Sequence, residues 1–438
     1  MSSASSEKSA PQDTQQRQHA DQEAAKPAPP AAFDPPDGGR AAWQTVAAGW
    51  LCQFCSFGFI NALGTFQLVY ETDILKTASS SAISWILTMQ LFLMFFLSQP
   101  VGMIVDMFGP RAILMPTSIL AVVGLVALSF AKEYWQIFLA QSLCFGLGAA
   151  GIFVPGLVTA SQYFKRKRAF AVGIVASGSS VGGVVFPVFL AQLFDQIGFR
   201  ATIRWTALMV GVLLAIANVL VVPPIKPKGW AGRRTLLSVA VFKQPAYVLF
   251  VGGSFFFFWG LFGPFNYLPL FAEQAQSTYA VASYTVSILN AASIFGRILP
   301  PLYSDRVGHF SVITVCAFVA GLSVLVVWLP INTHHSLGGL IVFALVFGFF
   351  SGAFVSLITP CLLQVAGGHT ADLGAMLGTY FAVAAIASLT GLPIQGAITG
   401  SGDDLTGLIV FSGVAMVVGS AGLVGAMGVL RKKRNADH

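Results

Sequence analysis

The sequence predicts an all-α membrane protein with twelve transmembrane helices in two pseudo-symmetric six-helix bundles. Of its 438 residues, 55% are hydrophobic and only 9% are charged, whereas a soluble protein carries about 25% charged residues. The mean hydropathy of +0.76 agrees with a membrane protein. Apolar runs long enough to cross a bilayer also follow one another from about residue 45 onward.

Twelve apolar runs have this length, and we expect each to be a helix because backbone groups in lipid must bond within their own segment. Their approximate limits are 45–69, 83–104, 112–131, 136–160, 169–192, 202–223, 246–270, 281–300, 310–330, 337–360, 373–397 and 405–430. Residues 1–42 are rich in Ser, Gln, Ala and Pro, so we expect a disordered cytoplasmic N-tail. The first apolar run begins too late for a signal peptide.

The longest internal loop, 224–245, divides the chain into two halves. This loop is basic and lies between the sixth and seventh runs, so the predicted bundles are 43–223 and 246–430. A weak repeat supports the division, since Asp-x-x-Gly begins at Asp106 after the second run and at Asp305 after the eighth. Parallel duplication of a six-helix unit predicts such a repeat.

The positions of the basic residues predict the topology. With a cytoplasmic N-terminus, 19 of the 24 Lys and Arg residues fall in cytoplasmic loops and tails, including a basic C-tail at 431–438. Four fall outside and one falls within the membrane, which is the positive-inside distribution. The net charge of +7 therefore does not indicate a nucleic-acid partner. We expect a monomeric, multi-pass protein of the plasma membrane with both termini in the cytoplasm.

The cysteines and histidines predict no cofactor and no metal site. All five cysteines lie in apolar runs, and the six histidines form no cluster. Cys52 and Cys55 form a C-x-x-C pair without a second pair or a nearby His, so we interpret them as small packing residues. No cluster of acids, bases or metal ligands lies in any run, which argues against an enzyme.

The most specific local motif is Gly-x-x-x-Asp-x-x-Gly-x-Arg at 102–111. Its glycines allow two helix ends to approach, and its Asp and Arg can lock these ends by charge pairing and helix-dipole contacts. The alternative is an ordinary loop turn. With the related stretch after the eighth run, the predicted gating residues are Gly102, Asp106, Gly109, Arg111, Asp305, Arg306 and Gly308.

Several motifs carry a resemblance to a known family. The motif at 102–111 resembles the loop 2–3 motif of the major facilitator superfamily. Tyr163-Phe164, a basic run, A-x-G and G-S-x-x-G together resemble the entry to helix five in the monocarboxylate porter family. Asp37-Gly38-Gly39 resembles the motif that precedes helix one in that family, and Asn290 with Arg297 resembles its fungal branch. The resemblance implies a major facilitator fold that moves an organic anion.

Arg297 is a lone cation inside an apolar run. In a helix over 281–300, Ser283, Ser287, Asn290, Ser293 and Arg297 share one face. A central Arg costs about 2.5–3.5 kcal/mol on insertion scales, and such residues usually mark a substrate pathway. The polar stripe predicts a water-filled cavity. The alternative is snorkelling, in which the long Arg side chain reaches the headgroups.

The resemblance implies that Arg297 binds a substrate carboxylate through two parallel hydrogen bonds. The better-known animal members carry an aspartate where this chain has Ser293, and a lysine that Asn61 matches here. Other polar groups in apolar runs either line the cavity or bond neighbouring helices. The predicted substrate-binding residues are Arg297, Asn290, Ser293, Asn61, Tyr284, Asn266, Tyr267 and Tyr380.

The predicted function is transport of a small, monocarboxylate-like organic anion by alternating access. An alternative is efflux of a fungal metabolite or a larger organic acid, and a remote one is a non-transporting membrane sensor. None of the 17 carboxylates lies in the middle of a run. The sequence therefore shows no proton relay through buried carboxylates. The alternatives are coupling through the substrate's own carboxyl proton, exchange for another anion, and flux driven by the substrate gradient alone.

Overall fold

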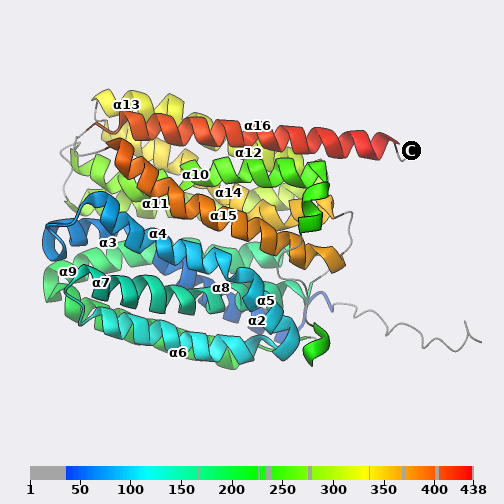
Figure 1. Cartoon of the computed structure of the whole chain (residues 1–438), viewed down its shortest axis with the longest axis horizontal. Helices are drawn as coiled ribbons and strands as arrows, with labels where there is room; N and C mark the ends of the chain where they lie inside the picture. Colours follow the sequence, from blue (N-terminus) through cyan, green and yellow to red (C-terminus); the bar gives the residue numbers. More distant parts are fainter. Residues whose placement is uncertain are drawn as a thin grey trace, which may run out of the picture. The chain divides into compact units, whose positions relative to one another are not determined.

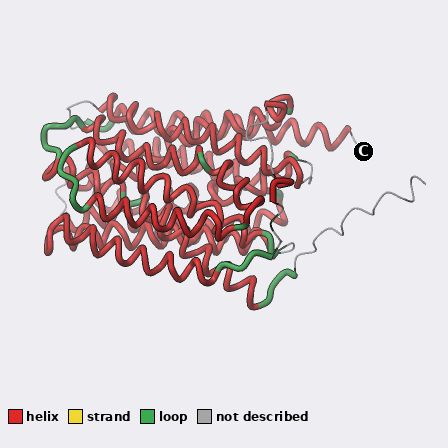
Figure 2. The backbone as a smooth tube through the Cα atoms, turned by 60° about the horizontal axis from the view of Figure 1, so that its bottom comes forward, coloured by secondary structure: helices red, strands yellow, loops and turns green. Residues whose placement is uncertain are grey.

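The computed structural model is almost entirely helical, with no strand in the part of the chain that it describes (Figure 2). The described residues are 36–164, 167–224, 227, 229–232, 239–274, 279–334, 336–366, 370–399 and 404–436. Most of the predicted N-tail and parts of the basic loop 224–245 lie outside these residues. The side chains of Ser283 and Asp305 also lie outside the description.

Short π-helical turns interrupt several helices of the first half. Its elements are α2 (Arg40–Gln53), η1 (Phe54–Gly58), α3 (Leu63–Val69), η2 (Tyr70–Ile74), α4 (Ser80–Phe96), α5 (Ser98–Phe108), α6 (Pro110–Leu128), α7 (Tyr134–Ile137), η3 (Phe138–Phe145), α8 (Gly146–Ser161) and α9 (Arg168–Leu220).

Two 3₁₀ turns in the central loop, η4 (Gly229–Gly232) and η5 (Val239–Lys243), precede the second half. Its elements are α10 (Pro245–Gln274), α11 (Tyr279–Val307), α12 (His309–Ser323), η6 (Val324–Trp328), α13 (Leu329–His334), α14 (Leu337–Val365), α15 (Thr370–Thr399) and α16 (Thr406–Ala436).

The described residues contain twelve segments that match the twelve predicted runs. Ten helical stretches are long and apolar enough to cross a membrane, and the bent pair of α4 and α5 provides an eleventh. The twelfth comes from α9, which turns at Gly198, where φ is 75° and ψ is 167°. Glycine adopts this positive φ without a steric penalty, so the chain can reverse between the two parts of α9.

The helices pack mainly within each half. In Figure 1, α2 to α9 lie in the lower part of the view and α10 to α16 in the upper part. In the second half, α11 packs along α14 and α10 packs along α16. The principal contacts between the halves join α9 to α11, and α4 with α5 to α15. Arg297 on α11 therefore faces the interface, while the exact bundle limits, 43–223 and 246–430, stay predictions.

The repeated Asp-x-x-Gly stretch forms the same turn in both halves. Gly109 has a φ of 86° and its N–H donates to the Val105 carbonyl at 2.9 Å. Gly308 has a φ of 102° and its N–H donates to the Ser304 carbonyl at 2.8 Å. Each glycine directly precedes the next helix. Because a side chain would strain this backbone, both positions favour glycine.

Candidate functional site

The Arg297 side chain is buried at the interface of α11 with α9, where it is 4% exposed. Its Nη1 donates to the Ala176 carbonyl at 3.0 Å and to Ser179 Oγ, both on α9. Its Nε donates to Ser293 Oγ, one turn earlier on α11, at 3.3 Å. Arg297 therefore connects the two halves of the protein and does not extend to the membrane surface.

The polar stripe of α11 packs against α9 along several turns. Ser287 Oγ donates to the Val184 carbonyl at 3.1 Å, and Ser180 Oγ donates to Ser293 Oγ at 3.3 Å. Asn290 is fully buried and donates to the Val286 carbonyl of its own helix at 3.0 Å. The sequence predicted a water-filled cavity here, whereas in this conformation the stripe faces protein.

Small residues on α9 make this approach possible. A Cβ added at Gly183 would overlap the amide of Asn290, and one at Gly173 would lie 3.1 Å from the Arg297 carbonyl oxygen. On the side facing the first helix, a Cβ at Gly182 would lie 2.6 Å from the Gly58 Cα. The G-S-S-V-G-G stretch at 178–183 thus packs against both halves at once.

The first transmembrane segment changes its helical form beside Arg297. The π-helical turn η1 contains Phe57, and the Arg297 Cζ lies 5.8 Å from the centroid of the Phe57 ring. After this turn the helix breaks at Asn61, whose side chain donates to the Ser179 carbonyl at 3.1 Å. Ser179 therefore contacts Arg297 through its hydroxyl and Asn61 through its carbonyl.

Aromatic rings from five helical elements form a connected group that reaches Arg297 through Phe57. We call Phe57, Phe95, Phe153, Phe258 and Phe381 the central aromatic cluster. They come from η1, α4, α8, α10 and α15. The ring centroids of Phe57 lie 6.0 Å from Phe95 and 6.1 Å from Phe153, and those of Phe95 and Phe381 stack at 5.8 Å. Neither this cluster nor Ser179 was predicted from the sequence.

The structure brings some predicted substrate-binding residues together and separates others. Arg297, Ser293, Asn290 and Asn61 contact one stretch of α9. Tyr380 is buried, and its ring lies edge-on to Phe381 at 5.5 Å.

Two further predicted residues lie just beyond Asn61 along the first segment. Asn266 and Tyr267 on α10 are buried close to α3, because a Cβ added at Gly64 would lie 3.3 Å from the Asn266 carbonyl oxygen.

Tyr284 does not join the group around Arg297. It is 40% exposed, and its hydroxyl accepts a hydrogen bond from Gln192 at 3.3 Å. Thirteen residues of helix separate it from Arg297, or about 20 Å at 1.5 Å per residue. A single small substrate held by Arg297 would not reach it.

The chemistry of the site favours an anion. In the described part of the chain, the partners of the guanidinium are two hydroxyls, one carbonyl and one aromatic face, all of them neutral. Nε and Nη1 make these hydrogen bonds, and Nη2 makes none within that part. A buried cation needs a compensating charge, and a carboxylate can accept directly from the planar guanidinium.

The predicted gating motif lies where α5, α6 and α9 end or begin. Arg111 donates through Nε to the Val221 carbonyl and through Nη2 to the Val219 carbonyl, both at 3.2 Å. Thr45 and Tyr163 donate to the next free carbonyl, that of Val222, at 3.1 and 2.9 Å. These donors satisfy the carbonyls that a helix leaves free at its C-terminus.

The Asp37-Gly38-Gly39 motif is docked at this same end. The N–H of Asp37 donates to the Tyr163 carbonyl at 3.0 Å, and Asp37 has a φ of 52°.

In the second half, Arg306 is exposed and Ser304 Oγ lies 2.8 Å from His309 Nδ1. The pairing of Asp106 with Arg111 and the gating role itself stay predictions.

Replacing Arg111 with alanine should slow transport without weakening substrate binding. The variant loses two bonds to α9 at an exposed site, and a change of about 1 kcal/mol between two conformations alters their ratio about fivefold. We expect the maximal rate in proteoliposomes to fall about fivefold with an unchanged KM. Arg431→Ala, in the exposed end of α16, is the control. An increased KM with a normal maximal rate would contradict the gating role.

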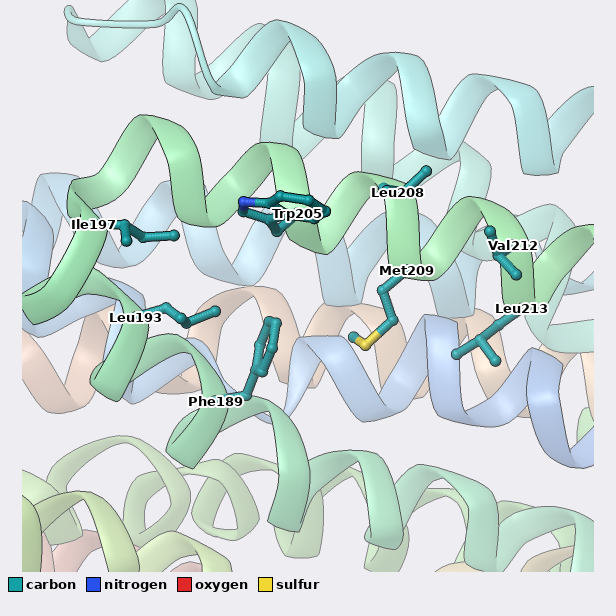
Figure 3. Close-up of a pocket in the computed structure, with 8 residues that line it drawn as sticks. All are labelled: Phe189, Leu193, Ile197, Trp205, Leu208, Met209, Val212 and Leu213. Atoms are coloured by element: carbon teal, nitrogen blue, oxygen red, sulfur yellow. The ribbon is translucent and has the colours of Figure 1, made fainter.

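An apolar pocket of about 530 Å³ lies elsewhere, between the two parts of α9 on either side of Gly198 (Figure 3). Its lining is entirely apolar and includes Phe189, Met209 and Trp205, which is 58% exposed. Such a surface suits lipid chains. The buried interface at Arg297 is the better candidate for recognition of a charged solute, because it contains the polar groups.

Comparison with known proteins identifies the family. The model of the Major Facilitator Superfamily matches residues 49–392. The chain belongs to the major facilitator superfamily. This membership, with the helical fold and its apolar spans, establishes a multi-pass membrane transporter and not an enzyme. The finer resemblance to the monocarboxylate porters stays a prediction.

Fungal members of the superfamily are similar over most of their length. The chain is 45% identical to the MFS-type transporter hasB of Aspergillus fumigatus, covering 88% of each protein. It is 38% identical to the fujikurins efflux protein of Gibberella fujikuroi, covering 98% of this chain and 91% of the relative. It is also 38% identical to the agnestins efflux protein AgnL12 of Paecilomyces divaricatus, covering 86% and 84%. Two of these three relatives are named as efflux proteins.

Proposed function

We propose that this major facilitator protein exports an acidic fungal metabolite and that Arg297 binds its anionic group. The observation that carries the proposal is the buried guanidinium, whose partners in the described residues are all neutral. The relatives named as efflux proteins support the direction of transport.

In this proposal the neighbours of Arg297 orient it for the substrate. Ser293 holds Nε and Ser179 holds Nη1, so the Nη2 edge is presented to a ligand. The Asn61 side chain donates to the backbone carbonyl of Ser179 and so fixes the α9 backbone at one wall of the site. A carboxylate at Nη2 would provide the missing negative charge in a region of low dielectric, where the attraction is strong.

The contacts of Arg297 also suggest how binding is coupled to movement. Its bonds to Ala176 and Ser179 hold α11 of the second half against α9 of the first. An anion that attracts the guanidinium competes with these bonds and so alters the relative energy of two arrangements of the halves. Rocking of the halves about a central site is the expected mode of alternating access.

Coupling in this proposal does not use a carboxylate in the middle of the membrane. Asp106 lies near the end of α5 and Asp305 near the end of α11, away from the middle of each helix. Transport would then be driven in one of three ways. These are movement of the substrate's own carboxyl proton, exchange for another anion, and the substrate gradient alone.

Export can be tested in yeast cells that produce this chain and are preloaded with labelled benzoate, acetate or succinate at pH 8. We expect faster loss of at least one label than from cells with an empty vector. Proteoliposomes containing only this protein should show the same flux, measured against protein-free liposomes. Equal loss of all three labels with and without the protein would reject export of an organic acid.

A further inference from the structure

The central aromatic cluster has no role in the function proposed so far, although it lies against Arg297. Three of its rings come from the first half and two from the second. Besides the stack of Phe95 on Phe381, Phe95 lies 6.0 Å from Phe258 and Phe153 lies 6.5 Å from Phe381, centroid to centroid. The cluster therefore crosses the interface that must open and close during alternating access.

One ring of the central aromatic cluster is not fully buried. Phe381 is partly exposed, whereas Phe57, Phe95, Phe153 and Phe258 are buried. The Phe381 ring contacts rings of α4 and α8 in the other half, so it is directed inward and not toward lipid. A ring that joins the two halves is therefore the one in the cluster that is not fully buried.

The central aromatic cluster contacts Arg297 through Phe57. The Phe57 ring makes edge contacts with the Phe95 and Phe153 rings, and the Arg297 guanidinium lies over the same Phe57 ring. A purely structural core would not need a cation at its edge, and a site for a short acid such as acetate would not need five rings. Flat π faces favour stacking with another flat ring.

We infer that the substrate class is an organic acid with an aromatic or conjugated planar body. Its acidic group would bind Nη2 of Arg297, and its planar body would lie against the rings of the central aromatic cluster. The ring pairs between the halves, Phe95 with Phe381 above all, would separate and stack on the substrate instead. This inference rests on the proposed function and specifies its substrate.

The test measures binding to the purified full-length protein by ligand-induced thermal stabilisation. The probes are 2-naphthoate, acetate and the neutral 2-naphthamide. We expect 2-naphthoate to bind at least about tenfold more tightly than acetate, because ring contacts add to the charge interaction. We expect 2-naphthamide to bind at least about tenfold more weakly than 2-naphthoate, because it lacks the charge.

Matched Phe→Leu variants locate the binding surface. Phe95→Leu on one half and Phe381→Leu on the other should each weaken 2-naphthoate binding about three- to tenfold and leave acetate binding unchanged. Two variants are used so that a folding defect in one does not decide the result. The control is Phe295→Leu on α11, because Phe295 is 60% exposed on the side away from Arg297.

Three outcomes would overturn this inference. They are equal binding of acetate and 2-naphthoate, equal binding of 2-naphthoate and 2-naphthamide, and wild-type binding of 2-naphthoate by both cluster variants. Any of these with acetate or succinate efflux intact would reject the aromatic substrate class alone. Absence of efflux in yeast with the expected binding pattern intact would reject export alone.

Discussion

Arg297→Ala is expected to abolish transport while the protein still folds and reaches the membrane. The variant removes the cation that would hold the substrate anion at the interface of α9 and α11. Because an interaction with a buried charge is worth several kcal/mol when one partner is lost, we expect transport to fall at least about 100-fold. Flux of labelled benzoate in proteoliposomes, normalised to the amount of folded protein, is the measurement.

The fold should tolerate this change because the groups around Arg297 have other partners. Ser179 Oγ donates to the Ala176 carbonyl at 2.8 Å without help from the guanidinium. Ser293 retains its bond from Ser180 at 3.3 Å. Removing a charge from the membrane interior also removes its insertion cost of about 2.5–3.5 kcal/mol. We therefore expect normal expression and a monodisperse protein after purification.

Arg297→Lys tests whether the positive charge alone is sufficient or whether the planar geometry of the guanidinium is also required. Lysine keeps the positive charge but lacks the planar fork that binds Ser179, Ser293 and an anion together. We expect weak residual flux with a raised KM. Arg431→Ala, at the exposed end of α16, is the control for loss of a cation. Near-normal flux in Arg297→Ala, with Asp106→Asn impaired, would make Arg297 a structural contact between the halves.

The features predicted from sequence are those with a large local energetic cost. Lipid imposes long apolar helices, so all twelve runs were visible. Arg297 was identified because a cation in an apolar run has a high insertion cost. The spacing of Ser287, Asn290 and Ser293 identified the helix face on which it lies. The two glycines of the repeated motif, at 109 and 308, were identified because Asp-x-x-Gly recurs at the equivalent place in each half.

The features missed from sequence depend on helices that meet only in three dimensions. With 38 phenylalanines in the chain, nothing local distinguishes Phe95 or Phe381 from a ring that faces lipid. Ser179 was hidden in a stretch that close helix packing explains equally well. The cavity expected beside α11 is filled by α9 in this conformation, and a sequence does not show which of several arrangements is adopted.

A second glycine pattern determines where Arg297 points. Gly348 and Gly352 on α14 are four residues apart, and both contact α11. A Cβ at Gly348 would overlap the Leu289 carbonyl, and one at Gly352 would lie 2.8 Å from the Ser293 carbonyl oxygen. These obstacles are backbone atoms, which cannot rotate away. The close approach of α14 therefore supports α11 while the polar stripe of α11 contacts α9.

Gly348→Ala should consequently reduce both stability and substrate binding. The added methyl forces α11 and α14 apart, and such overpacking costs about 1–3 kcal/mol. We expect a lower apparent Tm in detergent and weaker stabilisation by 2-naphthoate, because the displaced α11 carries Arg297. Gly252→Ala on α10 is the matched control, since a Cβ at Gly252 would have no atom within 4 Å. A wild-type Tm for Gly348→Ala would show that α14 does not hold α11 in place, whereas a lowered Tm with wild-type binding would show that the position of Arg297 does not depend on this contact.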